Sequence, residues 1–546
     1  MKIKSLLLGS LALAGVSGFA AGAQAADLAK GVMTSLDVCD ALGLSGLTIS
    51  SDTDCLQITG GVSYMFAWGD YKAGAGTGSG GQGIVKTGDD TYAIPVAGDS
   101  SSTSGRATDW DSQMIAWLQA VGTADSDFGP AKVVIKLKSE QYRHSANGYG
   151  WYDGDDTGGA TTNIGLGENN SIHPMPISKG PSGTVIFDQA YVSVGDSTVL
   201  TAGKAGSIAN TDDDTPLNYL GLFNSDNVGT GVLWSKEGYA GGNLYGTINN
   251  STANVDGSGA DIQTGGTVIQ VTSSLGNGIT LKGGLEDLQD THPERAGTAV
   301  GVISYAGDNL TAHLTVIEAG ILDGHPDVFA YHTGFTGTFD KFKIVGAVAG
   351  DSSGYYNALA SAQASFDMFK LAASVETARN SNNAVGSLPA GTGTFAGNAG
   401  SESSAGVQSF GAGLSGSLTV SDGVSINLGG RYFDSDVATS NNEGYQVAAS
   451  IVAAVTETIT LTGEIGVYGQ DSGGALKTVS YASSSTATAA TAFSTSSASA
   501  GTWENTYYGA ASIAWAPGGG FTSSLKGEVY SDGAYRATFN AAKNFQ

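Results

Sequence analysis

The chain has 546 residues, of which 83 are Gly and 10 are Pro, and only 14% are charged. Its 24 basic residues stand against 50 acidic residues, and this net charge of −26 excludes the basic face that a nucleic-acid-binding protein needs. With 41% hydrophobic residues and a mean hydropathy of −0.01, the chain is too polar for a bundle of transmembrane helices and too weakly charged for disorder by self-repulsion.

The first residues have the pattern of a secretory signal peptide over 1–25. Lys2 and Lys4 precede an apolar run, and Ala23-Gln24-Ala25 matches an A-x-A cleavage site. A membrane anchor helix is the alternative, but the apolar core is short and interrupted by Gly and Ser. Cleavage after Ala25 removes two lysines and leaves 22 basic and 50 acidic residues, a net charge of −28. No later apolar stretch is long enough for a transmembrane helix, so the mature chain is expected in the periplasm, outside the cell, or in an outer membrane as a β-barrel.

Two cysteines, Cys39 and Cys55, lie shortly after the expected cleavage site. In an oxidising compartment such a pair is most simply one disulfide, within an N-terminal periplasmic segment over 26–55. A metal site would need further ligands nearby, and a redox pair more often has the spacing C-x-x-C. No EF-hand spacing occurs either, so neither a metal site nor a cofactor is predicted.

From Leu56 to the end, at 56–546, apolar and polar residues alternate with period two. In 278–287, for example, Ile279 and Leu281 fall on one face and Lys282 on the other, and segments 133–142, 423–432 and 458–467 repeat this pattern. Strands with one apolar and one polar face are therefore predicted. Counting hairpins gives up to 22 candidate strands, at 56–69, 109–122, 130–143, 183–195, 198–204, 228–238, 240–249, 264–275, 278–288, 298–306, 309–319, 328–339, 341–350, 356–367, 369–378, 406–420, 423–433, 443–456, 458–468, 504–515, 520–531 and 533–545.

Tight turns alternate with long polar loops along this meander, as they do in outer-membrane barrels. A soluble β-sandwich or a β-solenoid is the alternative, since its sheets would also have one apolar face. A barrel is favoured because the polar faces are mostly uncharged, because aromatic residues gather near strand ends (Tyr64, Phe66, Trp68, Tyr507, Tyr508 and Trp515), and because closure removes exposed edges. The repeats have no fixed period, which disfavours a solenoid. The predicted fold is all-β: a closed antiparallel transmembrane β-barrel of the bacterial outer membrane, with short periplasmic turns and long extracellular loops.

Three stretches resemble the alphaproteobacterial general porins. The opening Val38-Cys39-Asp40-Ala41, followed by Asp54-Cys55-Leu56-Gln57-Ile58-Thr59-Gly60-Gly61-Val62, is similar to that family's first residues. The stretch Asp188–Gly195 with Leu200–Lys204 resembles the hairpin before the family's third loop, and Asp532–Arg536 with Asn544-Phe545 resembles its last strand. The resemblance implies a 16-stranded barrel, usually a homotrimer, that passes small hydrophilic solutes. Two features depart from the family: the hairpin count exceeds 16, and Gln546 follows the aromatic residue that normally ends the chain.

The candidate constriction loop is 205–227, which holds four acidic residues and no basic one: Asp212, Asp213, Asp214 and Asp226. A solvated surface loop is the alternative, and the inward-folded interpretation rests partly on the family's third loop. If apolar residues face lipid, seven bases point into the lumen: Lys136, Lys138, Lys282, Lys370, Arg431, Lys526 and Arg536. They could set a transverse field against the acidic loop, or each could simply pair with a neighbour such as Glu140, Glu286, Glu376 or Glu528.

The sequence therefore predicts a porin, a water-filled channel for passive diffusion of small hydrophilic solutes and ions with mild cation preference. Its expected partners are outer-membrane lipid, lipopolysaccharide, the diffusing solutes and two further copies of the chain. A TonB-dependent transporter would need a large N-terminal plug, and no G-x-S-x-G or H-E-x-x-H motif suggests a hydrolase, so no enzyme activity is expected. A surface adhesin or a structural array protein without a channel remains the alternative.

Overall fold

A computed structural model describes most of the predicted strand region. The described residues are 39, 46–51, 53–70, 84–87, 90–93, 109–144, 185–210, 212–213, 216–220, 264–288, 297–322, 324, 329–351, 356–379, 408–437, 440–471, 503–531, 533 and 535–545. The expected signal peptide lies outside them. Within this part of the chain, no helix has the length and apolar character needed to cross a membrane.

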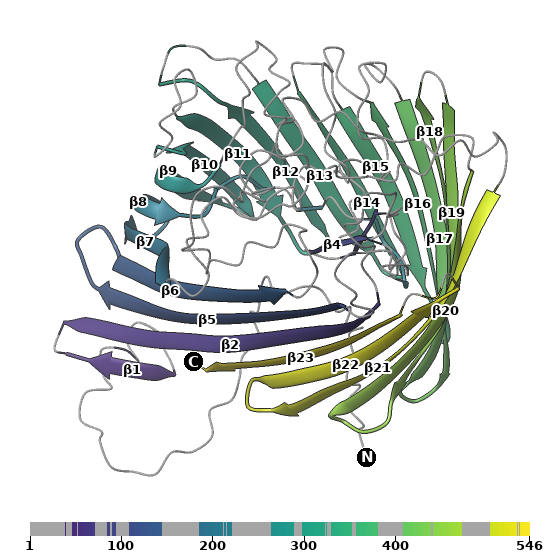
Figure 1. Cartoon of the computed structure of the whole chain (residues 1–546). Helices are drawn as coiled ribbons and strands as arrows, with labels where there is room; N and C mark the ends of the chain where they lie inside the picture. The colour runs from purple at the N-terminus through teal and green to yellow at the C-terminus, as the bar shows by residue number, and fades with distance from the viewer. Residues whose placement is uncertain are drawn as a thin grey trace, which may run out of the picture.

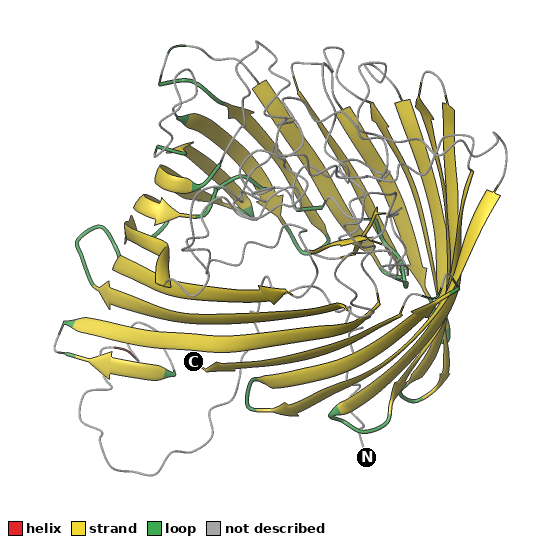
Figure 2. Ribbon diagram, viewed as in Figure 1, coloured by secondary structure: helices red, strands yellow, loops and turns green. Residues whose placement is uncertain are grey.

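Twenty long strands form the wall of the molecule (Figures 1 and 2). Their bounds are Asp54–Asp70 (β2), Asp109–Ala124 (β5), Ala131–His144 (β6), Val185–Gly195 (β7), Thr198–Ala205 (β8), Gly266–Gly276 (β9), Ile279–Glu286 (β10), Thr298–Ala306 (β11), Leu310–Glu318 (β12), Phe329–Phe339 (β13), Phe342–Asp351 (β14), Tyr356–Ser365 (β15), Phe369–Arg379 (β16), Gln408–Ser421 (β17), Val424–Val437 (β18), Ser440–Ala454 (β19), Ile459–Asp471 (β20), Trp503–Gly518 (β21), Phe521–Tyr530 (β22) and Tyr535–Phe545 (β23). Three short strands accompany them: Leu47–Ser50 (β1), Ile84–Thr87 (β3) and Asp90–Ala93 (β4).

The wall is a closed antiparallel barrel. Each strand pairs with its neighbours in chain order, and β2 closes the ring by pairing with β23 on one side and β5 on the other. Of the 21 strands in this sheet, β1 pairs only with β2, so the described barrel has 20 strands. The family resemblance implied 16, and this is wrong for the described barrel.

The 20 barrel strands match 20 of the 22 strands counted in the sequence. The other two predicted strands, 228–238 and 240–249, lie outside the described residues. Because β8 pairs directly with β9, the hydrogen-bonded ladder leaves no place for them between these two strands. The small β3–β4 sheet forms within a segment that the sequence suggested to be a loop.

The outer face of the barrel carries the apolar half of each alternating strand. Leu281, Leu428 and Ile465 point outward and remain exposed, Ile465 by 67%. Such exposure of large apolar side chains suits a surface that contacts lipid. The alternation read from the sequence is therefore confirmed, and the chain is a multi-pass barrel of the bacterial outer-membrane type.

Aromatic side chains mark both rims of the apolar band. Trp68 contacts Tyr535 near the long loops, with ring centroids 5.6 Å apart, and Trp515 contacts Phe521 near the short turns, at 5.5 Å. Interfacial aromatic residues of this kind anchor barrels at the two membrane surfaces. The prediction was wrong for Tyr508: its neighbour Tyr507 takes the outward position, so alternation turns Tyr508 toward the lumen, where its hydroxyl donates to Glu464 at 2.7 Å.

The long connections all lie at one end of the barrel, and every connection at the other end is short. Tight turns join β9 to β10, β13 to β14 and β17 to β18 on the periplasmic side, and the long connections lie on the extracellular side. Turn chemistry fits this arrangement, because Asn277, Gly278 and Asp340 have the positive φ angles that two-residue hairpin turns require.

Cys39 and Cys55 form a disulfide at the periplasmic end of β2, and both side chains are buried. Next to it, β1 pairs with β2 from Leu47 opposite Ile58 to Ser50 opposite Cys55. On the same edge of β2, β23 begins to pair only at Gly60. The disulfide-linked β1 thus covers the stretch of β2 that extends beyond the C-terminal strand.

Candidate functional site

A segment after β8 turns into the barrel and lies against its inner wall. We call its described residues, 206–210, 212–213 and 216–220, the strap. Main-chain N–H groups of the strap donate to side chains of four wall strands, in the pairs Ile208–Glu286 (2.8 Å), Asn210–Thr315 (3.1 Å), Leu217–Ser361 (2.9 Å) and Tyr219–Ser415 (3.1 Å). These contacts lead from β10 across β12 and β15 to β17. The strap therefore follows the inner wall across the lumen and is not a loop that projects from the rim.

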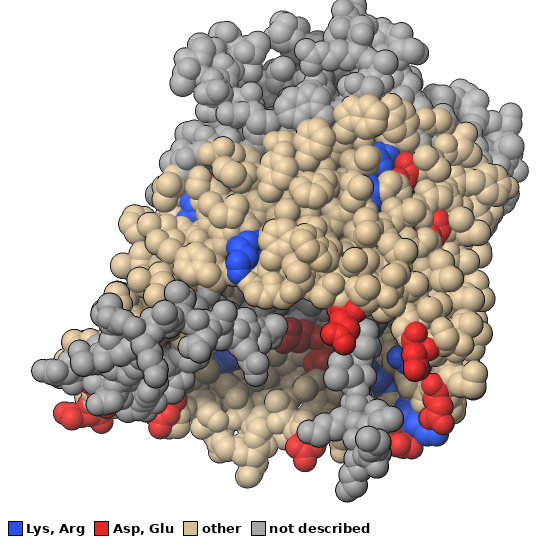
Figure 3. Space-filling view, turned by 90° about the horizontal axis from the view of Figure 1, so that it is seen from below, with Lys and Arg blue, Asp and Glu red and all other residues tan. Residues whose placement is uncertain are grey.

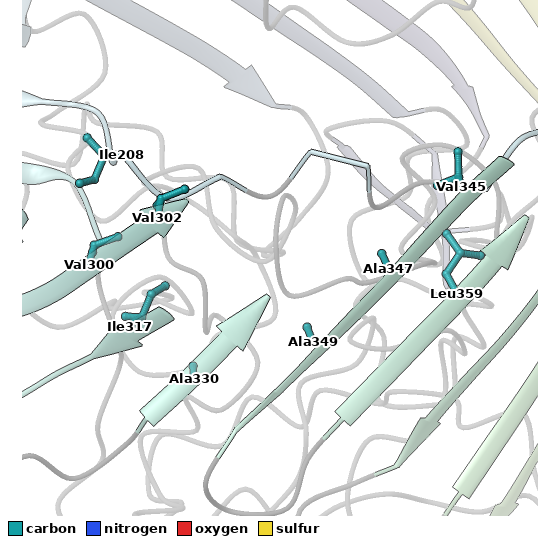
Figure 4. Packing of buried hydrophobic residues seen from close by; sticks show 9 residues of the cluster. All are labelled: Ile208, Val300, Val302, Ile317, Ala330, Val345, Ala347, Ala349 and Leu359. Atoms are coloured by element: carbon teal, nitrogen blue, oxygen red, sulfur yellow. The ribbon is translucent and has the colours of Figure 1, made fainter. Parts of the chain in front are cut away.

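An apolar cluster lies beneath the strap (Figure 4). Ile208 of the strap packs with buried wall residues, and Ala209 and Leu217 pack against the same cluster. Ile317, at 1% exposure, is one of its largest members. The wall residues of the cluster are Val300, Val302, Ile317, Ala330, Val345, Ala347, Ala349 and Leu359. Without the strap, these apolar wall side chains would face the water of the lumen. Docking of the strap removes them from water, so the cluster stabilises the docked strap.

Glu286 ties together both ends of the segment between β8 and β9. Its Oε1 accepts from the N–H of Ile208 and from Gln270 Nε2, each at 2.8 Å, and its Oε2 accepts from the N–H of Gly265 at 2.6 Å. Gln270 also donates to the carbonyl of Gly206 at 2.9 Å. Since Glu286 is fully buried, these hydrogen bonds replace the water that its carboxylate loses. The sequence suggested Glu286 as the ion-pair partner of a wall base, and the structure instead gives it the role of a clamp on the strap.

The acidic part of the strap rests on two stacked histidines. Asp213 Oδ2 lies 3.4 Å from His313 Nδ1, an ion-pair distance, and Thr311 Oγ1 donates to Asp213 Oδ1 at 2.9 Å. His313 Nε2 lies 2.7 Å from His332 Nδ1, with the two rings nearly parallel. Gly334 makes this approach possible, because a Cβ there would come within 3.0 Å of both Asp213 Cβ and the His313 ring.

The pKa of Asp213 reflects this environment. Partial burial raises the pKa, but the His313 ring and the hydroxyls of Thr336 and Thr311 beside the carboxylate outweigh that effect and hold the pKa below its usual value. Asp213 is therefore charged when the strap is docked at neutral pH.

The structure describes two of the four acidic residues predicted for the constriction. Asp212 is exposed on the strap, and Asp213 is half-buried against the wall. Asp214 and Asp226 lie outside the described residues. The described residues contain no group of three or more His, Cys, Asp and Glu side chains placed to hold a metal ion.

The seven predicted lumenal bases all occupy inward-facing positions, because each alternates with exposed apolar neighbours on its strand. Several also pair with an acidic residue, as the alternative interpretation suggested. The ion pairs are Lys136 with Asp188 (2.6 Å), Lys138 with Glu140, Lys526 with Glu528 (2.8 Å) and Arg536 with Glu528 (2.7 Å). Arg431 is buried at 3% exposure, Lys282 lies in the middle of β10, and Lys370 lies near the periplasmic end of β16. Glu376, the other suggested partner, has no described side chain.

The bases on β22 and β23 lie across the ring from Asp213, whereas the end of the strap reaches their side of the barrel, where Leu220 packs with Ala448 of β19 and Tyr508 of β21. Asp213 docks on β12 and β13, and β22 lies ten strands from β12 in either direction around the 20-stranded ring. There Lys526 and Arg536 share the carboxylate of Glu528, and Glu464 of β20 lies within electrostatic reach of Lys526, so two bases face two acidic residues. From below, Figure 3 shows charged side chains around the hollow and few on the broad outer surface. The lumen thus has acidic strap residues at one wall and bases paired with acidic residues at the other.

Sequence reasoning missed the residues that dock the strap, although the sequence contains a signal for them. A wet lumen predicts polar residues on the inner face, yet 299–303 (AVGVI) and 344–349 (IVGAVA) are apolar on both faces. A strand with two apolar faces must be covered on both sides. His313 and His332 belong to no sequence motif. They become visible as a pair only through the β12–β13 register, which sets His313 opposite Gly334 and Thr315 opposite His332.

Comparison with known proteins gives structural matches only. No protein-family profile matches the chain, and no curated protein matches it. Similar solved structures include OccAB3 of Acinetobacter baumannii (9% identity, 90% of this chain and 99% of that one, TM-score 0.40) and OccD3 (OpdP) of Pseudomonas aeruginosa (8%, 89% and 91%, 0.38). The anion-selective porin of Comamonas acidovorans is also similar (12%, 90% and 100%, 0.34). At these identities and TM-scores the functional argument rests on the geometry of this chain.

Proposed function

We propose that the chain is an outer-membrane porin, a water-filled channel through which small hydrophilic solutes and ions diffuse passively. The observation that carries this proposal is the strap, a segment packed inside a closed barrel so that it narrows the lumen with acidic residues. A diffusion pore needs a lumen of suitable width and a charged constriction, and it needs no catalytic residue.

The charges favour mild cation preference. Asp212 is exposed and Asp213 is charged on the strap, and the strap segment contains no base. Most of the opposing bases share or pair with carboxylates, so they offset only part of this negative potential. A field from acidic residues in a narrow, low-dielectric passage raises the local cation concentration.

Reversal potentials across planar bilayers test this preference. The wild-type channel should favour K⁺ over Cl⁻, and the variant with Asp212, Asp213 and Asp214 all changed to Asn should lose much of that preference. Asp422→Asn removes an exposed acid from a periplasmic turn and serves as the matched control, with no expected change. Anion preference that stays the same in the triple variant would contradict the proposal.

The same proposal includes the assembly and the membrane partners. We expect a homotrimer that sits in outer-membrane lipid and lipopolysaccharide, and the outer face of exposed apolar side chains with aromatic rims fits this expectation. The opening residues suggest membership of the alphaproteobacterial general porins. The mature chain would start at 26 with its disulfide segment in the periplasm. Detergent-resistant trimers on unheated gels and stable conductance steps would support it. A folded barrel that gives no conductance would favour the adhesin or array protein instead.

A further inference from the structure

The buried pair of histidines beneath the strap is not needed to build a barrel wall. His332 is 0% exposed and His313 is 5% exposed, and both lie on the lumenal face of adjacent strands, where neighbouring positions carry Thr, Gly and Ala. The pair contacts the one strap residue, Asp213, whose carboxylate is charged and turned toward the wall. The histidine pair therefore places a titratable group in direct contact with a charged residue of the constriction.

The distance between the two rings limits how many protons the pair can hold. At 2.7 Å between His313 Nε2 and His332 Nδ1, one nitrogen donates and the other accepts. Two imidazolium rings would place two N–H groups against each other at this contact. The docked pair can therefore hold one extra proton and not two, and the carboxylate of Asp213 lies next to that proton's positive charge.

Among the residues that the structure describes, the charged groups near the pair can be located from the strand register and the strap. In the strand register, His313 lies between Ser304 of β11 and Gly334 of β13, and His332 lies between Thr315 of β12 and Ala349 of β14. From the strap, Asp213 faces the pair, and Asp212 lies beside it with its side chain exposed. The nearest other charged positions on the inward register of β14 are Lys343, opposite Thr338, and Asp351, opposite Ala330.

We propose that His313 and His332 act as a one-proton charge switch beneath the constriction. Imidazole is the side chain that ordinarily changes charge between pH 5 and 8. When the pair takes up a proton from solvent, it gains one positive charge and offsets one of the two described strap carboxylates, Asp212 and Asp213. The strap stays docked, because the added charge strengthens the contact with Asp213. Cation preference therefore falls in mildly acidic medium without a large movement.

This inference rests on the proposed channel function. Reversal potentials measured across planar bilayers between pH 8 and pH 5 test both the channel and the charge switch. Wild-type cation preference should fall as the pH falls, by about as much as Asp212→Asn lowers it at pH 8, since each change removes one net negative charge. The double variant His313→Asn/His332→Asn should show a flat profile. Asp212→Asn is the matched control, with lower preference at every pH and the same pH dependence as the wild type.

Two further measurements remain decisive if the double variant does not fold. Nitrogen-15 NMR of labelled histidines in the detergent-solubilised wild-type barrel should show one proton shared by a coupled pair at pH 5. Hydrogen-exchange protection of the strap should be at least as high at pH 5 as at pH 8. A pH-independent wild-type selectivity, an unaltered pH profile in the double variant, two independently titrating rings, or loss of strap protection at pH 5 would each overturn the switch. A barrel without any conductance would instead overturn the proposed channel, while the NMR titration still decides whether the proton pair exists.

Discussion

Thr315→Val tests most sharply whether wall hydroxyls hold the strap in the lumen. The Thr315 hydroxyl donates to the carbonyl of Asn210 at 2.6 Å and accepts from the N–H of the same residue at 3.1 Å. Valine has nearly the same shape and can do neither. Because Thr315 is fully buried, both main-chain groups of Asn210 would lose their partner at a site that water does not readily reach.

The expected cost follows from those two groups. Leaving a buried polar group unsatisfied costs about 1–3 kcal/mol, so two partly rehydrated groups should destabilise the docked strap by about 2–4 kcal/mol. This corresponds to an opening equilibrium that is roughly 30-fold to 1,000-fold larger. The barrel ladder itself is unaffected, since β12 keeps its main-chain pairing with β11 and β13.

Hydrogen exchange at the amides of 208–220 measures this equilibrium directly, and single-channel current noise reports the resulting motion. Thr462→Val is the matched control, because Thr462 faces the lumen on β20, pairs with Val452 of β19, and is not among the wall side chains that hydrogen-bond to the strap. Strap protection in Thr315→Val that equals the wild-type value would refute the docking argument, as would an equal loss in the control.

Three further predictions follow from the same geometry. Glu286→Gln replaces one acceptor oxygen by a donor that faces a main-chain N–H, so the strap should loosen by about 1.5–3 kcal/mol and open-channel noise should rise, while Glu457→Gln in a periplasmic turn should change neither. Cys39→Ser/Cys55→Ser removes a bridge between residues 16 apart, worth about 3 kcal/mol in the chain-entropy model, so the barrel should unfold on gels at a lower temperature and no longer respond to reductant; an unchanged transition would show that β1 holds without the disulfide. The lowered pKa of Asp213 stabilises the docked strap above the usual carboxyl pKa, and this contribution is lost as the pH falls through the lowered value, so strap protection should decline in strong acid in the wild type and show no such decline in Asp213→Asn.

The barrel was predictable from local pattern because, in each strand, apolar side chains that face lipid alternate with polar side chains that face the lumen. The alternation of Leu281 with Lys282, or of Leu428 with Asn427, is a property of a few neighbouring residues, and the structure confirms it. Strand number was less accessible, because it depends on which segments enter the ladder. Periodicity alone cannot tell that β8 pairs with β9 across the segment that includes 228–249.

The site was only partly predictable. The acidic loop followed from composition and its inward fold partly from the family resemblance, and the inward-facing bases followed from parity. Their partners depend on contacts between residues far apart in the chain. Glu286 binds the N–H of Ile208 from 78 positions away, and Thr315 binds Asn210 from 105 positions away. No pattern in the sequence specifies such pairs. The apolar runs at 299–303 and 344–349 could have indicated that something covers the inner wall, though not what covers it.

Single-channel conductance of the wild-type chain, compared with a variant that lacks 207–220, tests the central claim most directly. The account predicts stable conductance steps for the wild type and clearly larger steps for the shortened chain, because the strap occupies the lumen along the wall from β10 to β17. Wild-type barrels that give no steps, or steps of equal size in the two proteins, would contradict it.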